Sequence, residues 1–443
     1  MLFDLMFKGK SWKKFFLSVY ASMLGLLSSF NPSARMIDMP EAPNDFVPVM
    51  RFTIASDVHI RDEGNEAERE RLALMIQKSY EIAEADGSYT ALDAVCFAGD
   101  ITDAGTRSSF EVFKQICEDN IRQGTLFLPM LGNHDFKTEG KNTRDVFAEI
   151  FEYGPDFHVA VNGVHIIASS KIGDNASRNL KSMHWLREQL DQAKSDNPDN
   201  PIFVIQHEHI FNTVYGSYNW GDIGLKNTLS AYSQVIDFSG HSHYPINDPR
   251  SIWQGKFTAL GTGSLSYFEL EVDGESGKFP QNYREAAQMY VVEVAANGAT
   301  RIRCYDLISD SFFGETYYIE KPSDPSTFAY NEKNRKAKSI APVFLEGTQI
   351  TPGLLESGET ALTFQQAKDD LIVHNYRIAV KDEKGNYVYE DAFITDYFLV
   401  DSSDTCTVNV GRLESGKEYS VSISAENAFG QRSLPITATF TAQ

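Results

Sequence analysis

Histidine, aspartate and asparagine residues recur in five short segments between residues 54 and 243, each at the end of an apolar run. Six of the ten histidines in the chain lie in these segments. The segments read IASDVH, CFAGD, PMLGNHD, IFVIQHEH and DFSGHSH. Mixed imidazole, carboxylate and amide groups suit borderline or hard metal ions such as manganese, iron and zinc. The types and spacing of these residues therefore predict a metal site.

The segments offer more ligands than one metal ion needs. A single ion takes about three or four protein ligands in such sites, whereas these segments supply seven or eight candidates. Two ions that share one bridging carboxylate would account for the whole set. Asp100 is the natural bridge, because it is the single strong ligand of its segment and has two carboxylate oxygens.

Alternating strands and helices are predicted to position the five segments. Apolar runs predict strands at residues 51–56, 93–99, 125–131, 201–206 and 234–240. Amphipathic segments predict helices at residues 66–85, 108–120, 143–152 and 181–195. Asn162-Gly163 between two β-rich runs predicts a hairpin over residues 157–170. The alternation favours a layered α/β fold, with the segments at the carboxyl ends of parallel strands, where open α/β sheets place their chemistry.

The order of the five segments resembles the calcineurin-like metallophosphoesterase superfamily. The patterns D-x-H, G-D-x-x-D, G-N-H-D, a single H and G-H-x-H follow one another across roughly residues 50–260. The resemblance implies a four-layer αββα sandwich over residues 50–320. It also implies hydrolysis of a phosphate ester with two divalent or trivalent ions of manganese, iron or zinc.

The resemblance further implies a role for each candidate residue. One metal would be held by Asp57, His59 and His243, and the other by Asn133, His207 and His241, with Asp100 shared. A hydroxide between the ions would attack phosphorus. His134 would protonate the leaving oxygen or stabilise its charge, and Asp103 would pair with His134 and fix its tautomer.

Two departures from related branches narrow the expected substrate. Purple acid phosphatases carry a tyrosine where this chain has Asp103, and protein Ser/Thr phosphatases carry an arginine where it has Ala104. The two-histidine GHSH segment looks more like the phosphodiesterase and small-molecule branches. A phosphodiester such as a cyclic nucleotide or a glycerophosphodiester is therefore expected. The alternatives are a phosphomonoesterase or nucleotidase and, from another class, a cell-surface binding protein with a vestigial enzyme domain.

Several neighbouring residues have open or structural interpretations. His209 is either a ligand or a pocket residue, and Asp135 is expected to cap the turn after residue 131. The aromatic loop of residues 210–222 either packs on its own domain or presents rings that stack on a base or sugar. The rings in question are Tyr215, Tyr218 and Trp220. Structural roles are expected for four other histidines and the four cysteines, namely His158, His165, His184, His374, Cys96, Cys117, Cys304 and Cys406.

The first 35 residues are predicted to be a signal peptide or an uncleaved membrane anchor, followed by a linker at residues 36–49. Four lysines precede a 16-residue run of apolar and small residues, which is the order of a secretory signal. Export to the periplasm, cell surface or medium follows from this prediction. With 61 acidic and 40 basic residues, the formal charge of −21 disfavours long nucleic acid as a partner and leaves a small phosphoester as the expected substrate.

The last third of the chain has a different character. Residues 321–340 are polar, contain two prolines and are predicted to be a linker. Residues 341–443 show alternating β segments separated by turn residues, which predicts an all-β, immunoglobulin-like sandwich. This part resembles a fibronectin type III module, with Tyr419 in the tyrosine-corner position. Such a module would dock carbohydrate, a protein or the cell envelope.

Overall fold

The computed structural model describes residues 36–171 and 180–443, so the predicted signal or anchor segment of residues 1–35 lies outside the described residues. Residues 39–443 form one compact unit. Within the described ranges, no helix combines the length and apolar character that crossing a membrane requires.

The first of two large sheets has six strands in the order β14-β13-β12-β1-β2-β3. The strands β1, β2 and β3 are parallel, and the others pair antiparallel. Their bounds are Pro48–Ala55 (β1), Ala94–Phe97 (β2), Leu126–Pro129 (β3), Gln288–Ala295 (β12), Thr300–Asp306 (β13) and Ser311–Ile319 (β14). The helices that follow the parallel strands are α2 (Glu66–Ala85), α3 (Arg107–Asn120) and α4 (Thr143–Phe151).

The second sheet also has six strands, in the order β4-β5-β6-β7-β9-β8. The predicted hairpin is present, and its turn residues Asn162 and Gly163 have φ values of 50° and 79°. The strand bounds are Phe157–Val161 (β4), Val164–Ala168 (β5), Ile202–Ile205 (β6), Val235–Ser239 (β7), Ile252–Gln254 (β8) and Thr258–Gly261 (β9). The helices of this half are α5 (Leu180–Asp196), α6 (Ser217–Trp220) and α7 (Lys226–Leu229).

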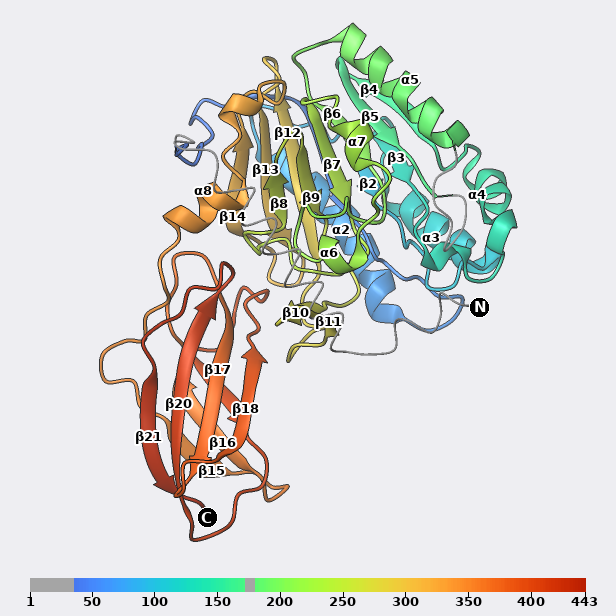
Figure 1. Cartoon of the computed structure of the whole chain (residues 1–443). Helices are drawn as coiled ribbons and strands as arrows, with labels where there is room; N and C mark the ends of the chain where they lie inside the picture. Colours follow the sequence, from blue (N-terminus) through green and yellow to red (C-terminus); the bar gives the residue numbers. More distant parts are fainter. Residues whose placement is uncertain (1–35, 172–179) are drawn as a thin grey trace, which may run out of the picture. The chain divides into compact units, whose positions relative to one another are not determined.

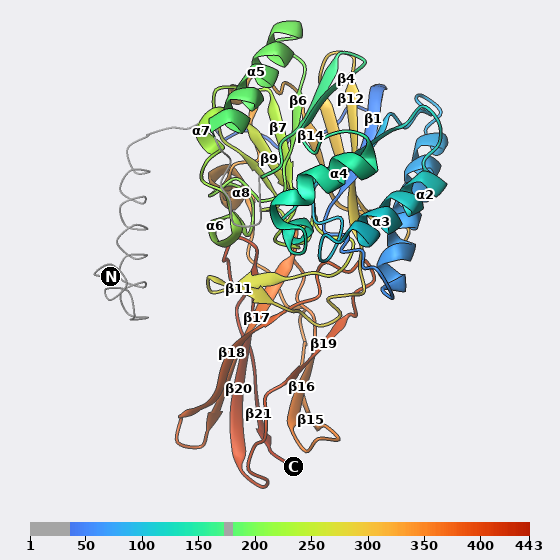
Figure 2. The same cartoon turned by 90° about the vertical axis from the view of Figure 1, so that its right-hand side faces the viewer.

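Three apolar cores join these elements into four layers. The central core lies between the sheets and pairs residues such as Phe52 of β1 with Phe203 of β6, whose ring centroids are 4.8 Å apart. A second core packs α2, α3 and α4 on the first sheet, and a third packs α5 and α7 on the other. In Figure 2 the sheets lie between α5 and α7 on one side and α2 and α3 on the other. The predicted αββα sandwich is confirmed.

Residues 321–340 connect the two parts of the chain but are not an exposed spacer. They contain a short 3-10 helix (Pro325–Thr327) and α8 (Glu332–Lys338). Tyr330 is 2% exposed in the central core, and its hydroxyl accepts a hydrogen bond from the Tyr318 amide. The apolar residues at 328–330, which have polar neighbours in the sequence, anchor this segment to the α/β layers.

The C-terminal part is the predicted all-β sandwich (Figure 1). A three-stranded sheet, β15-β16-β19, faces a four-stranded sheet, β18-β17-β20-β21, across a shared apolar core. The Tyr419 hydroxyl accepts a hydrogen bond from the Glu414 amide at 3.1 Å, which is the geometry of a tyrosine corner. The strands are β15 (Thr351–Leu354), β16 (Thr360–Gln365), β17 (Val373–Asp382), β18 (Tyr387–Ile394), β19 (Thr405–Asn409), β20 (Glu418–Asn427) and β21 (Ile436–Thr441).

Candidate metal centre

The structure brings the five predicted segments to the carboxyl ends of five strands. Each segment directly follows one of β1, β2, β3, β6 and β7, all of which have a parallel neighbour. The His and Asp ligand atoms form two groups, Asp57, His59 and His243 in one and Asp100, His207 and His241 in the other, and the ligand atoms of each group lie within 4.8 Å of one another. The polar residues that follow the apolar strands therefore converge at the strand ends, as the alternation of strands and helices predicts.

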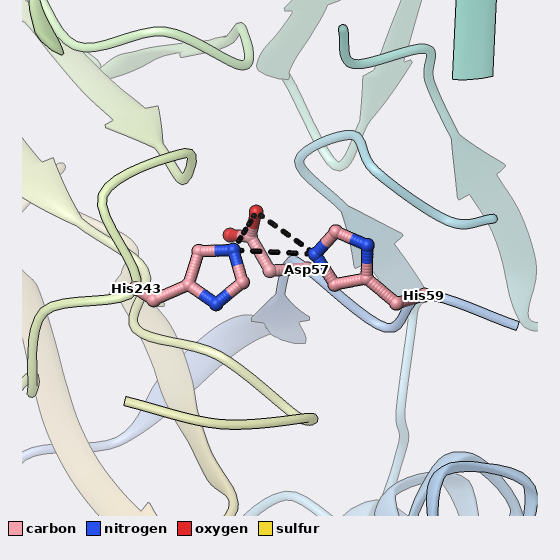
Figure 3. Close-up of side chains that lie close together, drawn as sticks. All are labelled: Asp57, His59 and His243. Carbon is pink, nitrogen blue, oxygen red and sulfur yellow. Dashed lines mark hydrogen bonds and ion pairs between the residues drawn. The ribbon is translucent and has the colours of Figure 1, made fainter. Parts of the chain in front are cut away.

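The first group consists of Asp57, His59 and His243, whose side chains point toward one another in Figure 3. The Nε2 atom of His243 lies 3.2 Å from Asp57 Oδ1 and 3.2 Å from His59 Nε2. His243 Nδ1 donates to the Tyr267 carbonyl at 3.1 Å, so its Nε2 is the nitrogen directed at the group. Asp57 Oδ1 is buried and makes no hydrogen bond within the part of the chain that the structure describes.

This donor set fits a cation. Two imidazole nitrogens and a carboxylate oxygen converge, and a positive ion would satisfy the buried oxygen that lacks a hydrogen bond. Burial alone would raise the pKa of Asp57, but the His243 imidazole outweighs it and holds the pKa well below its usual value. The carboxylate is therefore ionised and ready to bind a cation.

The second group contains Asp100, Asn133, His207 and His241. His207 Nε2 lies 3.2 Å from Asp100 Oδ2 and 3.1 Å from Asn133 Oδ1, and its Nδ1 donates to the Ala98 carbonyl at 2.8 Å. The His241 ring lies edge-on to the His207 ring, with centroids 5.2 Å apart. Burial lowers the pKa of His207, but the adjacent Asp100 carboxylate raises it to about 10. All seven predicted ligands therefore lie in two neighbouring groups, and sharing of Asp100 stays a prediction.

His134 and Asp103 lie beside the first group. Asp103 Oδ1 is 3.4 Å from His134 Nδ1 and 3.6 Å from His59 Nδ1, so one carboxylate contacts both the predicted leaving-group histidine and a predicted metal ligand. The hydrogen bond to His134 holds the pKa of Asp103 well below its usual value. Burial opposes protonation of His134, yet the Asp103 carboxylate raises its pKa. The contact with His59 is a link that the sequence did not indicate.

Backbone conformation sets these side-chain directions. Five of the seven predicted ligands have positive φ, a region that non-glycine residues adopt rarely. The values are 54° (Asp57), 56° (His59), 49° (Asp100), 72° (His241) and 57° (His243). Left-handed residues at strand ends turn the chain sharply, so that Asp57 and His59 reach one group while His241 and His243 reach two neighbouring groups.

Two glycines permit the close approach of the segments. A Cβ atom added to Gly240 would lie 2.4 Å from Ser56 Oγ and 2.5 Å from Asp57 Oδ2. One added to Gly132 would lie 2.2 Å from Asp100 Oδ1. Each glycine precedes a predicted ligand, so a side chain there would displace a ligand from another strand.

The structure resolves the open interpretations of two neighbours. His209 is buried, and its Nδ1 and Nε2 lie 2.9 Å from Ser239 Oγ and 2.7 Å from Ser242 Oγ, which leaves neither nitrogen for a metal. Asp135 accepts hydrogen bonds from the Gly132 amide and from the amide and hydroxyl of Thr102, which braces the turn as predicted. Burial raises the pKa of Asp135 to about 7.

The aromatic loop is partly buried and partly exposed, and stacking on a base or sugar stays a prediction. Tyr215 is buried and packs within the protein, whereas Tyr218 and Trp220 are 50% and 37% exposed. The Trp220 ring lies edge-on to His241, with centroids 5.7 Å apart. The sequence did not predict a second aromatic group beside the site. The Tyr267 ring packs on the His243 ring with centroids 4.2 Å apart, and the exposed Phe279 ring lies 6.0 Å from that of Tyr267. Nothing in the sequence distinguishes those two rings from core residues.

Residues 50–245 match the family model for calcineurin-like phosphoesterases. The chain contains a calcineurin-like phosphoesterase domain. No curated protein matches the chain. The domain is of the metallophosphoesterase type, and its two ligand groups are consistent with a dinuclear site.

The solved structures that match the chain share little sequence with it. The purple acid phosphatase PPD1 of yellow lupin (Lupinus luteus) is 13% identical over 62% of this chain and 54% of its own, with a TM-score of 0.44. PhoD is 11% identical over 67% of this chain and 79% of its own, with a TM-score of 0.34. The FN1-FN3 domains of chicken CNTN1 are 13% identical over 38% of this chain and 47% of theirs, with a TM-score of 0.18. The chain thus spans about half the length of the lupin protein.

Proposed function

We propose that the protein hydrolyses a phosphodiester at a dinuclear metal centre, with a cyclic nucleotide or a glycerophosphodiester as the substrate class. The observation that carries the proposal is the adjacency of two buried ligand groups with His134 and Asp103 beside them. When bound, two ions of manganese, iron or zinc supply Lewis-acid activation of the phosphoryl group and of water.

The protein residues position the substrate and move one proton. Asn133 and His207 present their amide oxygen and Nε2 on one side, and His59 and His243 present imidazole nitrogens on the other. His134 is half-buried at the edge of the first group, where it donates a proton to the leaving oxygen. Asp103 holds the orientation of that imidazole.

The charge around the two groups favours a diester over a monoester. A phosphomonoester carries a charge of about −1.5 to −2 at neutral pH, whereas a diester carries a single negative charge. Of the cations near the groups, Lys171 pairs with Glu208 at 2.7 Å and Arg61 with Asp103 at 2.8 Å, whereas Lys137 contacts the His134 ring. Glu269, whose amide donates to the His243 carbonyl, adds a further carboxyl group. The carboxylates around the groups repel a dianion more than a monoanion.

The test compares turnover of bis(p-nitrophenyl) phosphate and p-nitrophenyl phosphate by the manganese-loaded protein. We expect a higher kcat/KM for the diester and loss of both activities in Asp100→Asn. His184→Ala, which changes an exposed histidine of α5, is the matched control with unchanged turnover. Preference for the monoester would favour the phosphatase or nucleotidase alternative. A metal-loaded protein that hydrolyses neither ester would favour a binding protein with a vestigial enzyme domain.

Export remains part of the proposal. The lysine-rich start and apolar run of residues 1–35 support a secretory signal or an anchor. Fractionation of cells that express the full chain or a chain without residues 1–35 tests it. The full chain should reach the envelope or medium, and cytosolic retention of both would refute export.

A further inference from the structure

The C-terminal sandwich contacts the loops that carry the predicted ligands. A buried apolar cluster joins Phe398, from the loop after β18, to rings of the phosphoesterase domain. The Phe398 and Phe268 rings are stacked with centroids 5.3 Å apart, and both side chains are fully buried. A module attached only by a flexible linker would not bury an apolar contact of this kind.

Hydrogen bonds tie the same sandwich loop to the segment that follows His243. The buried Asp248 carboxylate accepts from the Tyr397 hydroxyl at 2.8 Å, and the Tyr397 carbonyl accepts from the Asn247 side chain at 2.9 Å. The Gln288 side chain of β12 joins the two parts: its nitrogen donates to the Phe398 carbonyl at 3.0 Å, and its oxygen accepts from the Ile246 amide at 3.0 Å. Residues 246–248 are thus held between the first sheet and the sandwich.

A second set of contacts fixes the aromatic loop. His374 of β17 lies with its Nε2 2.8 Å from the Tyr215 hydroxyl, which itself donates to the Glu271 carbonyl at 2.8 Å. The Arg250 guanidinium covers the Tyr215 ring at 3.6 Å and pairs with Asp248. The Tyr215 side chain is therefore held by contacts from both domains.

The contacts of Tyr215 extend to Tyr244, which is one residue from a predicted ligand. Tyr244, which directly follows His243, packs on Tyr215 with centroids 4.4 Å apart. Gly216 is the N-cap of α6, and a Cβ there would lie 2.7 Å from the Tyr244 ring. Helix α6 ends at Trp220 against His241. Both segments that contact the sandwich therefore lead directly to His241 or His243.

We infer that the C-terminal sandwich is a positioning element of the metal centre and that its loop 394–399 and His374 act through Tyr215 and Tyr244. The sandwich clamps the two segments that orient His241 and His243. This inference rests on the proposed metal centre and goes beyond it, because it assigns the module a role in metal binding that the resemblance to a docking module does not predict.

The test is a cobalt(II) titration of full-length variants, followed by visible absorption and by thermal unfolding. Phe398→Ala removes the stacked ring, and Tyr397→Phe removes only the hydrogen bond to Asp248. We expect cobalt affinity to fall about 10-fold in the first and about 3-fold in the second, with an altered d–d spectrum in both. Phe364→Ala, a deletion of equal size inside the sandwich core, is the matched control. It should lower Tm and leave affinity and spectrum unchanged.

Two outcomes would overturn the inference. If Phe398→Ala exposes the segment near Ile340 to protease, which shows a released sandwich, yet binds cobalt as the unaltered protein does, the sandwich does not position the ligands. Equal loss of affinity in Phe364→Ala would show a general effect of lower stability. Failure of the unaltered protein to bind cobalt would instead refute the proposed metal centre itself, and the inference with it.

Discussion

Acidification from pH 7.5 to 5.0 should destabilise the protein through His374. This buried imidazole is neutral, because its Nδ1 accepts from the Asn375 side chain and its Nε2–H donates to the Tyr215 hydroxyl. A second proton would break the bond to Asn375. Burial and the nearby Arg250 charge lower the pKa of His374 to about 3. The titratable and charged groups that face it are Tyr215, Asp248, Arg250, Arg377, Tyr397 and Glu426.

The size of the effect follows from proton linkage. In the unfolded chain His374 titrates near its ordinary pKa of about 6.5, whereas in the folded protein it stays neutral down to about pH 3. Between these values the unfolded state binds more protons, so stability falls as the pH falls. At pH 5.0 the cost is about 2 kcal/mol, and at pH 7.5 it is close to zero. The figure at pH 5.0 changes little for any folded-state pKa below about 4.

The assay is urea unfolding of the unaltered protein and of His374→Gln at both pH values. Glutamine can still donate to the Tyr215 hydroxyl but does not titrate. The loss of unfolding free energy on acidification should be about 2 kcal/mol smaller in the variant. Equal acid sensitivity in both proteins would refute a buried neutral His374.

Four further predictions concern the ligand groups. Asn133→Ala should lower metal occupancy measured by elemental analysis, whereas His134→Ala should keep both metals and lower kcat about 10²–10⁴-fold, most for poor leaving groups. Equal metal loss in both variants would contradict the separate roles. Gly240→Ala should weaken cobalt binding more than 10-fold, because its Cβ would lie 2.5 Å from Asp57 Oδ2; retained binding in the titration would show that the segment shifts freely. Trp220→Ala should raise KM several-fold with kcat unchanged if its exposed ring contacts the substrate, and an unchanged KM would exclude that contact. Chelation of metal held at 100 times its Kd should lower the unfolding free energy by about 2.7 kcal/mol per site, and an unchanged denaturation midpoint would argue against the site.

The sequence predicts elements best where local pattern and tertiary role coincide. The helix predicted at residues 66–85 has these bounds in the structure, because its apolar stripe is also the face that packs on the first sheet. The hairpin forms at Asn162-Gly163 because its two-residue turn requires positive φ at both positions, and Asn and Gly tolerate positive φ. The candidate ligands follow the ends of apolar runs, so the predicted strands place them at sheet edges, and the family resemblance implied that the two edges meet.

The sequence does not reveal contacts between distant segments. Tyr215 and His374 are far apart in the chain, and each is ordinary in its local context: one lies in a polar loop and the other in an alternating strand. The sandwich was therefore predicted as a docking module, and its packing against residues 246–248 and Tyr215 was not foreseen. In the same way, the polar composition of residues 321–340 predicted a linker and gave no sign that Tyr330 is buried.

The backbone of the predicted ligands explains why such distant support is needed. Positive φ at a non-glycine residue costs on the order of 1 kcal/mol or more, and five predicted ligands adopt it. Local sequence favours this only slightly, through the tolerance of Asp and His for the left-handed region. The strained segments must therefore be held by neighbours. Thr262 and Ser56 share a hydrogen bond beneath Asp57, and the sandwich holds the chain after His243. A site whose ligands are strained in this way depends on the whole compact unit, so a change in the sandwich should alter metal affinity.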